Sequence, residues 1–251
     1  MAQEMFGQAF APAKVNLFLH VGAPGDDGYH PLSSLLVFAD VGDRLSLAPA
    51  DALEFRLSGP FAESLSGEGN NLVVRAAQAL LGGLRGPRAP VGLMLDKALP
   101  VAAGLGGGSS DAGAALRLLR RAWAPELSDD ALQAIAADLG ADGAACLWGA
   151  PVLAEGRGDV LTPAPGLPVC PAVLINPGVP ASTAGVYGRL DALGVFGDVA
   201  PPPMPEAFES VEELAGWLSL QRNDLEAAAI GIAPEIGDVL ADLAAEPEVL
   251  L

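Results

Sequence analysis

The run PVAAGLGGGSSD, residues 100–111, lies between a predicted strand and a predicted helix, and it constrains this chain more than any other segment. Gly104, Gly106, Gly107 and Gly108 permit positive φ angles and let a ligand approach the backbone without a Cβ in the way. A helix that begins at such a loop points its first N–H groups and its positive end at one place. The run therefore predicts a site that holds a polyphosphate.

The two most familiar nucleotide-binding patterns do not describe this loop. The P-loop pattern GxxxxGK[ST] needs a Gly-Lys pair, and the chain contains none. The dinucleotide pattern GxGxxG is met at Gly104 and Gly106 but has Ser109 at its third glycine, although a serine there does not by itself exclude the pattern. A glycine loop with a purely structural role remains the alternative at this level.

Size and composition favour a globular protein of one large domain or two small ones. The chain has 251 residues, of which 51% are hydrophobic. Charged residues interrupt every apolar run well before the roughly 18 residues that a membrane span needs, and the N-terminus lacks the basic start of a signal peptide. Cys146 and Cys170 are the only cysteines and fall in no CxxC pair, so the sequence gives no support for a disulfide framework or a zinc site. We expect a cytoplasmic protein without a membrane partner.

Charge excludes one class of partner and singles out two residues. The net charge of −18 argues against nucleic acid, which binds to a basic face. Of the 13 basic residues only Lys14 and Lys97 are lysines. An ammonium suits a point contact with a phosphate or hydroxyl, so both are candidate site residues. Ordinary solvated lysines remain the alternative.

Periodicity and turn signals predict an alternation of strands and helices. We expect strands at 10–21, 33–41, 43–49, 91–99 and 172–178, and helices at 70–84, 109–123, 128–140, 211–220 and 225–245. Gly42 is predicted to be a turn between two strands, and Asn70 or Asn71 to cap the first helix. Ser109 or Ser110 is predicted to cap the helix that follows the glycine loop.

The glycine run resembles the second motif of the GHMP kinases, a superfamily of ATP-dependent small-molecule kinases. Four further segments resemble the branch that phosphorylates the 2-hydroxyl of 4-diphosphocytidyl-2-C-methyl-D-erythritol in the non-mevalonate isoprenoid pathway. They are APAKVNLFLHV, DGYHPLSSLLVFADVGD, NNLVVRAA and LGADGAACLWGAPVLAEGRGD, and the similarity continues more weakly in INPGVPASTAGVY and RNDLE. The resemblance implies a kinase (a transferase) with ATP as co-substrate, accompanied by Mg²⁺.

The resemblance also implies a fold. It predicts a two-domain α+β protein with a ribosomal S5 domain 2-like N-terminal domain at 1–158, a ferredoxin-like C-terminal domain at 159–251, and the active site between them. GHMP kinases carry a third glycine-rich motif in the second domain, and none is found here, so that domain is expected to be truncated. Two alternatives stay open: another GHMP kinase, acting on mevalonate or homoserine, and a catalytically weakened nucleotide-binding homologue.

The family's catalytic lysine and aspartate match Lys14 in PAKVN and Asp142 in LGADG. Asp142 is expected to accept the proton of the attacking hydroxyl, and Lys14 to orient that carboxylate and offset developing charge. The alternative for Asp142 is an ordinary turn residue, and the alternative for Lys14 is an exposed strand residue. The residues expected to bind ATP are Pro100, Val101, Ala102, Ala103, Gly104, Leu105, Gly106, Gly107, Gly108, Ser109 and Ser110, together with Asn71 and Lys97 near the base and ribose. Helix capping competes with this role at Asn71.

The remaining matches concern the second substrate. Tyr29 and His30 of the DGYH loop resemble the family's grip on the cytosine ring, where an aromatic face stacks and an imidazole or the adjacent backbone reads the base edge. Tyr187 is expected to stack from the other side, and Asn16 to touch the sugar alcohol or its hydroxyl. Ordinary packing is the alternative for an isolated aromatic residue.

Overall fold

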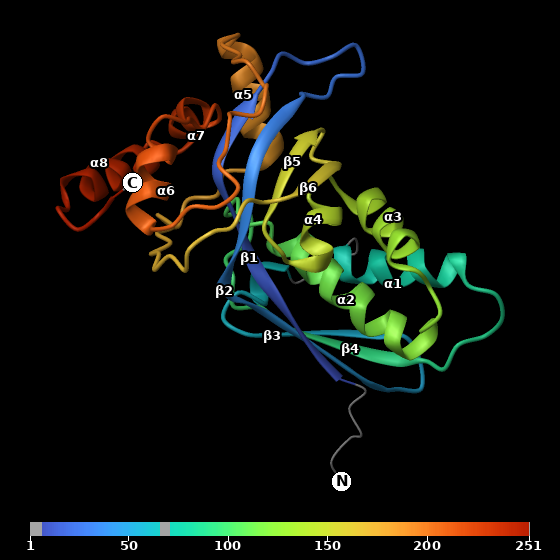
Figure 1. Ribbon diagram of the computed structural model, residues 1–251. Helices are drawn as coiled ribbons and strands as arrows, with labels where there is room; N and C mark the ends of the chain where they lie inside the picture. The colour runs from blue at the N-terminus through green and yellow to red at the C-terminus, as the bar shows by residue number, and fades with distance from the viewer. Residues whose placement is uncertain (1–6, 66–70, 251) are drawn as a thin grey trace. The chain divides into compact units, whose positions relative to one another are not determined.

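The structure is a computed structural model that describes residues 7–65 and 71–250 (Figure 1). Its strands are β1 Gly7–Val21, β2 Leu32–Pro49, β3 Glu54–Ser58, β4 Val91–Asp96, β5 Val152–Gly156 and β6 Val160–Pro163. Its helices are the 3₁₀ turn η1 Glu63–Leu65 and α1 Leu72–Gly83, α2 Gly107–Trp123, α3 Asp129–Leu139, α4 Gly143–Trp148, α5 Thr183–Leu193, α6 Val211–Leu218, α7 Glu226–Ile232 and α8 Glu235–Ala245. The strands form a single sheet in the hydrogen-bonded order β3-β4-β2-β5-β6, with β1 paired to β2. The predicted mixture of α and β structure is confirmed.

The chain forms two compact units, which we describe separately. Among the described residues the first unit comprises 7–15, 38–65, 71–101 and 105–150, and the second comprises 16–37, 102–104 and 151–250. Both β1 and β2 contribute residues to each unit. The predicted domain division into 1–158 and 159–251, and the expected truncation of the second domain, stay predictions.

The first unit packs helices onto strands. β4 pairs antiparallel with residues 44–49 of β2 and parallel with β3. Figure 1 shows α1 and α2 lying over β3 and β4. Val91, Leu93 and Leu95 of β4 are buried while Met94 is exposed, the period-two pattern of a strand with one buried face. Their buried face meets the apolar faces of α1 and α2 to make the core of the unit.

The structure corrects the prediction of a turn at Gly42. Residues 32–49 form one continuous strand, β2, that passes through this glycine. A Cβ at Gly42 would lie 2.3 Å from the Ala11 carbonyl oxygen and 2.7 Å from Pro12 Cα, both on β1. Glycine therefore stands here because another backbone approaches closely, which is the second common reason for a glycine inside a strand.

Gly42→Ala is expected to lower the free energy of unfolding by about 1–3 kcal/mol, because β1 must move away from the new methyl group. Gly82→Ala is the matched control, since a Cβ at Gly82 meets nothing within 4 Å. That helical substitution is expected to be neutral or to stabilise by up to about 1 kcal/mol. Urea unfolding of both variants measures the difference, and equal midpoints would contradict the close approach at Gly42.

Candidate site residues lie at the N-termini of α1 and α2. The Asn71 carboxamide oxygen accepts the Val73 N–H at 2.8 Å and caps α1, while Asn70 lies outside the described residues. The helix after the glycine loop was predicted to begin at Ser109 or Ser110, but α2 begins at Gly107. Its N-cap is Gly106, with φ +61°. Glycine adopts this left-handed conformation readily, so the helix begins at the glycines and not at a serine.

In the second unit, β5 pairs antiparallel with residues 32–36 of β2 and with β6. The predicted helix at 211–220 is confirmed as α6. The predicted helix at 225–245 is divided into α7 and α8 around Ala233 and Pro234. Proline disfavours a helical conformation in the residue before it, and Ala233 accordingly has φ −130° and ψ 86°.

The prediction of a buried strand at 172–178 is wrong. These residues form no strand, and Val173, Leu174 and Ile175 are 79%, 42% and 49% exposed. An apolar run becomes a buried strand only when a neighbouring strand and a covering layer are present, and none of the described strands pairs with this one. Of the described helices, none has the length and apolar character needed to cross a membrane.

Candidate active site

The end of the glycine loop and the start of α2 lie beside Lys14 in the first unit. The Lys14 N–H donates to the Leu105 carbonyl oxygen at 2.8 Å, which ties the loop to β1. A Cβ at Gly106 would lie 3.0 Å from Lys14 Cβ and 3.3 Å from its Cε, so the lysine stem runs directly against this glycine. The N-terminus of α2 therefore has an ammonium-bearing side chain next to it, an arrangement suited to phosphate.

Lys14 and Asp142 are brought together by elements far apart in sequence. The Lys14 Nζ lies 3.2 Å from Asp142 Oδ2, with Lys14 buried on β1 and the aspartate side chain 39% exposed. Asp142 occupies the position before α4, and Gly143 lets the start of α4 approach the backbone of α3, because a Cβ at Gly143 would lie 1.9 Å from the Ala136 carbonyl oxygen. The accessible carboxylate can accept a proton, and the buried ammonium holds it in place.

Lys97 and Asn71 have partners within the protein. The Lys97 side chain is 3% exposed, and its ammonium donates to Asp43 and, at 3.0 Å, to Asp111. The Asn71 carboxamide caps α1, which is the helix-capping role given above as the alternative for this residue. Contact of these two residues with the ATP base or ribose stays a prediction. Asp43 and Asp111 were not predicted as site residues, since nothing in the sequence placed two acids beside one of only two lysines.

The DGYH loop of the second unit is held from both ends. The Tyr29 N–H donates to Asp27 Oδ1 at 3.0 Å, and the Gly25 N–H donates to the Tyr29 carbonyl oxygen at 2.9 Å. Tyr29 is 59% exposed, and the Arg157 guanidinium carbon lies 4.3 Å from its ring centroid while Arg157 also pairs with Asp27. One face of the Tyr29 ring is thus covered by a cation.

His30 joins this loop to α5. Its Nδ1 lies 2.9 Å from the Gly22 carbonyl oxygen and its Nε2 lies 3.2 Å from Asp191 Oδ1. Its ring centroid is 5.1 Å from that of Tyr187, so the structure brings these two predicted residues into contact. Both imidazole nitrogens face acceptors of the protein. Arg157 and Asp191 were not anticipated from the sequence.

Asn16 is the fourth residue predicted to meet the second substrate. Its Nδ2 donates to Ser34 Oγ at 2.7 Å, and that hydroxyl donates to the Phe18 carbonyl oxygen at 2.5 Å. The carboxamide is thereby oriented by β2 while half-buried on β1. Its carboxamide oxygen remains the atom through which it could accept a substrate hydroxyl.

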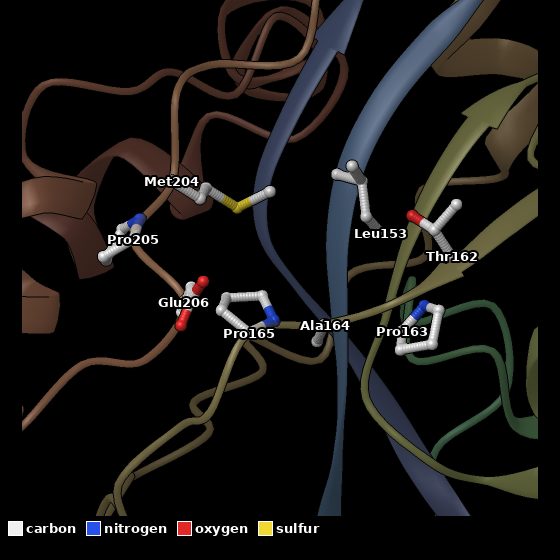
Figure 2. A pocket seen from close by; sticks show the side chains of 8 residues that line it. All are labelled: Leu153, Thr162, Pro163, Ala164, Pro165, Met204, Pro205 and Glu206. Atoms are coloured by element: carbon white, nitrogen blue, oxygen red, sulfur yellow. The ribbon is translucent and has the colours of Figure 1, made fainter.

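A pocket of about 400 Å³ in the second unit contains none of the predicted site residues (Figure 2). It is lined by Leu153, Thr162, Pro163, Ala164, Pro165, Met204, Pro205 and Glu206. Proline and aliphatic side chains make most of its wall, and Glu206 is the one charged group in it. Without a cation among its lining residues, it is poorly suited to a phosphorylated ligand.

The chain is closely similar to curated enzymes of one kind. It is 62% identical over 245 residues to the 4-diphosphocytidyl-2-C-methyl-D-erythritol kinase of Caulobacter vibrioides (strain NA1000 / CB15N), covering 97% of this chain and 84% of the relative. It is 47% identical over 247 residues to the enzyme of the same name from Hyphomonas neptunium, covering 96% and 81%. The chain belongs to the 4-diphosphocytidyl-2-C-methyl-D-erythritol kinase family. Residues 71–150 also match the family profile described as GHMP kinases N terminal domain.

A solved structure agrees with membership of this kinase family, and a second shows the shared fold. A crystal structure of 4-(cytidine 5'-diphospho)-2C-methyl-D-erythritol kinase aligns with a TM-score of 0.74 at 34% identity, covering 95% of this chain and 83% of that one. Homoserine kinase from Cytophaga hutchinsonii aligns with a TM-score of 0.60 at 19% identity, covering 94% and 78%, which shows the shared fold alone. The GHMP kinase fold is confirmed, while the ribosomal S5 domain 2-like and ferredoxin-like descriptions stay predictions.

Proposed function

We propose that the chain transfers the γ-phosphoryl group of ATP to the 2-hydroxyl of 4-diphosphocytidyl-2-C-methyl-D-erythritol, releasing ADP and the 2-phosphate. The observation that carries this proposal is the 62% identity to an enzyme of that name over 97% of the chain. The pairing of Lys14 with Asp142 beside the glycine loop supports it in atomic detail. The reaction belongs to the non-mevalonate route to isoprenoid (terpenoid) precursors, and we propose that it takes place in the cytoplasm.

The proposed chemistry depends on position and charge, since phosphoryl transfer needs little covalent help from a protein. Asp142 accepts the proton of the attacking hydroxyl as the bond to phosphorus forms. Lys14 holds that carboxylate at 3.2 Å and offsets negative charge on the transferred group. The residues of the loop at 100–110 hold the phosphates through backbone N–H groups at the start of α2. No covalent enzyme intermediate is required.

Mg²⁺ is proposed to accompany the nucleotide. Among the residues that the structure describes, no group of three or more acidic, histidine or cysteine side chains is arranged to hold a metal ion. When bound, the ion supplies neutralisation of phosphate charge.

The second unit is proposed to hold the cytidine end of the acceptor. The Tyr29 ring has one face covered by Arg157 and is 59% exposed, so cytosine stacks on its other face. Tyr187 contributes a second aromatic surface next to His30, and Asn16 accepts a hydroxyl of the sugar alcohol. A stacked base also separates this proposal from a kinase of mevalonate or homoserine, because those acceptors contain no base.

Tyr29→Ala is expected to raise KM for the cytidine acceptor about 5- to 100-fold, the loss of one base–aromatic stack. KM for ATP is expected to stay unchanged. Tyr29→Phe keeps the ring and is the control, with KM for the acceptor within about twofold of the parent because stacking needs the π face rather than the hydroxyl. Steady-state kinetics with each substrate varied in turn gives these values. Equal acceptor KM values for the alanine variant and the parent would refute cytosine stacking at Tyr29.

A further inference from the structure

Three charged side chains behind the glycine loop form a buried cluster, which we call the Lys97 clamp: Lys97, Asp43 and Asp111. Their exposed side-chain fractions are 3%, 0% and 3%. Lys97 Nζ donates to Asp43 and to Asp111, as described above. Charges this deeply buried cost free energy unless they are paired, so a cluster of three charges with two of one sign needs an explanation.

The clamp connects the two ends of the glycine loop within the first unit. Before the loop, Asp43 Oδ1 accepts the N–H groups of Ala98 at 2.6 Å and Leu99 at 2.8 Å. After the loop, Asp111 belongs to the second turn of α2, and a Cβ at Gly107 would lie 2.9 Å from Lys97 Nζ. The ammonium therefore lies against the first residue of the helix whose N-terminus is the proposed phosphate site.

The clamp is also incompletely paired. Asp111 Oδ1 is buried without a hydrogen-bond partner. Burial raises the pKa of Asp111 to about 7, although Lys97 acts in the opposite direction. Lys97 and Asp43 are the charged groups that act on this carboxyl.

We propose that the Lys97 clamp positions the N-terminus of α2 for the ATP phosphates, and that Asp111 sets the charge that lies behind them. This proposal rests on the proposed function in one respect, because it requires that the glycine loop binds ATP. With Asp111 protonated the three side chains sum to zero charge, and with Asp111 ionised they sum to −1. Lys97, Asp43 and Asp111 are positioning residues, since they act through the backbone and the field at the helix start.

The sign of the charge effect follows from the place of Asp111 in the helix. Asp111 is four residues beyond the first residue of α2, which is roughly 6 Å along the axis. An added negative charge at that range, at an effective dielectric constant of about 20, weakens binding of a polyphosphate about 3- to 10-fold after screening. ATP affinity is therefore expected to fall as the pH rises through the pKa of Asp111.

Isothermal titration of the full chain with a non-hydrolysable ATP analogue and Mg²⁺ tests this without any acceptor. Asp111→Asn imitates the protonated acid and cannot ionise. Between about pH 6 and about pH 8.5 the ratio of the parent Kd to the Asp111→Asn Kd is expected to rise about 3- to 10-fold. The nucleotide's own protonation cancels in that ratio. A ratio that stays constant with pH would overturn the proposal, because a merely structural role for Asp111 produces a constant offset.

A second variant tests positioning. Asp43→Asn is expected to raise KM for ATP about 3- to 10-fold while KM for the acceptor stays unchanged, because a weaker contact with Lys97 loosens the two ends of the loop, and this effect is expected to exceed the gain from removing one negative charge. Glu54→Gln is the matched control, because Glu54 pairs with Arg56 at the exposed surface of the same unit. Equal ATP KM values for Asp43→Asn and the control would also overturn the proposal.

The outcomes separate the clamp from the proposed function. A parent protein that binds the nucleotide with a pH-independent Kd ratio contradicts the clamp alone. A parent that shows the expected ratio but phosphorylates no cytidine acceptor contradicts the proposed function alone. A parent that binds no nucleotide contradicts both.

Discussion

Asp142→Asn is expected to lower kcat about 10²- to 10⁴-fold while the Kd for an ATP analogue stays within about twofold of the parent. Asparagine keeps the shape of the side chain and can still face the Lys14 ammonium at the observed 3.2 Å. It cannot take the proton of the attacking hydroxyl, so the loss falls on turnover and leaves nucleotide binding intact. Coupled ADP release measures kcat, and titration calorimetry measures binding.

Asp138→Asn is the matched control for this prediction. Asp138 is exposed on α3, four residues before the catalytic candidate, and the exchange removes the same charge. Its kcat is expected to equal that of the parent. An Asp142→Asn variant with unimpaired turnover would remove the proposed general base from the mechanism.

Lys97→Met is expected to lower the free energy of unfolding by about 3–5 kcal/mol, the usual cost of removing one member of a buried ion pair. The loss is large because Asp43 is fully buried and would be left without its ammonium partner. Arg56→Met is the control, since Arg56 pairs with Glu54 where its side chain is 74% exposed. Such surface pairs contribute about 0–1 kcal/mol.

Urea unfolding of both methionine variants gives the comparison, with the slope of each transition checked against the parent. A Lys97→Met protein as stable as Arg56→Met would show that the buried cluster contributes nothing to folding. In that case the clamp would also lose its main structural support.

Much of the local structure could be predicted because it depends on local signals. The strand predicted at 91–99 is present as β4, and the helix predicted at 128–140 is present as α3, with Ser128 and Gly140 as its caps. The errors came from contacts between distant segments. Gly42 was interpreted as a turn because its sequence neighbours carry no trace of β1 approaching within 2.3 Å. The apolar run at 172–178 was interpreted as buried because hydrophobicity predicts burial only where a covering layer exists.

Some residues of the candidate site could be predicted from the sequence and others could not. The glycine loop could be recognised from its own residues, and Lys14 and Asp142 from a resemblance. The structure places the side chains of Lys14 and Asp142 together, and their catalytic roles remain our proposal. Asp43, Asp111, Arg157 and Asp191 could not be predicted. Each acts through a partner distant in sequence, such as the 130 residues that separate Arg157 from Asp27. A single sequence gives no signal for such pairs of charged residues.

The central claim is the identity of the acceptor. The most direct measurement is coupled ADP release with ATP and Mg²⁺ and, in parallel, 4-diphosphocytidyl-2-C-methyl-D-erythritol, mevalonate and homoserine. We predict release with the cytidine acceptor alone, with the new phosphate found on its 2-oxygen. Release with mevalonate or homoserine instead, or phosphate at another position of the cytidine acceptor, would contradict the proposed function.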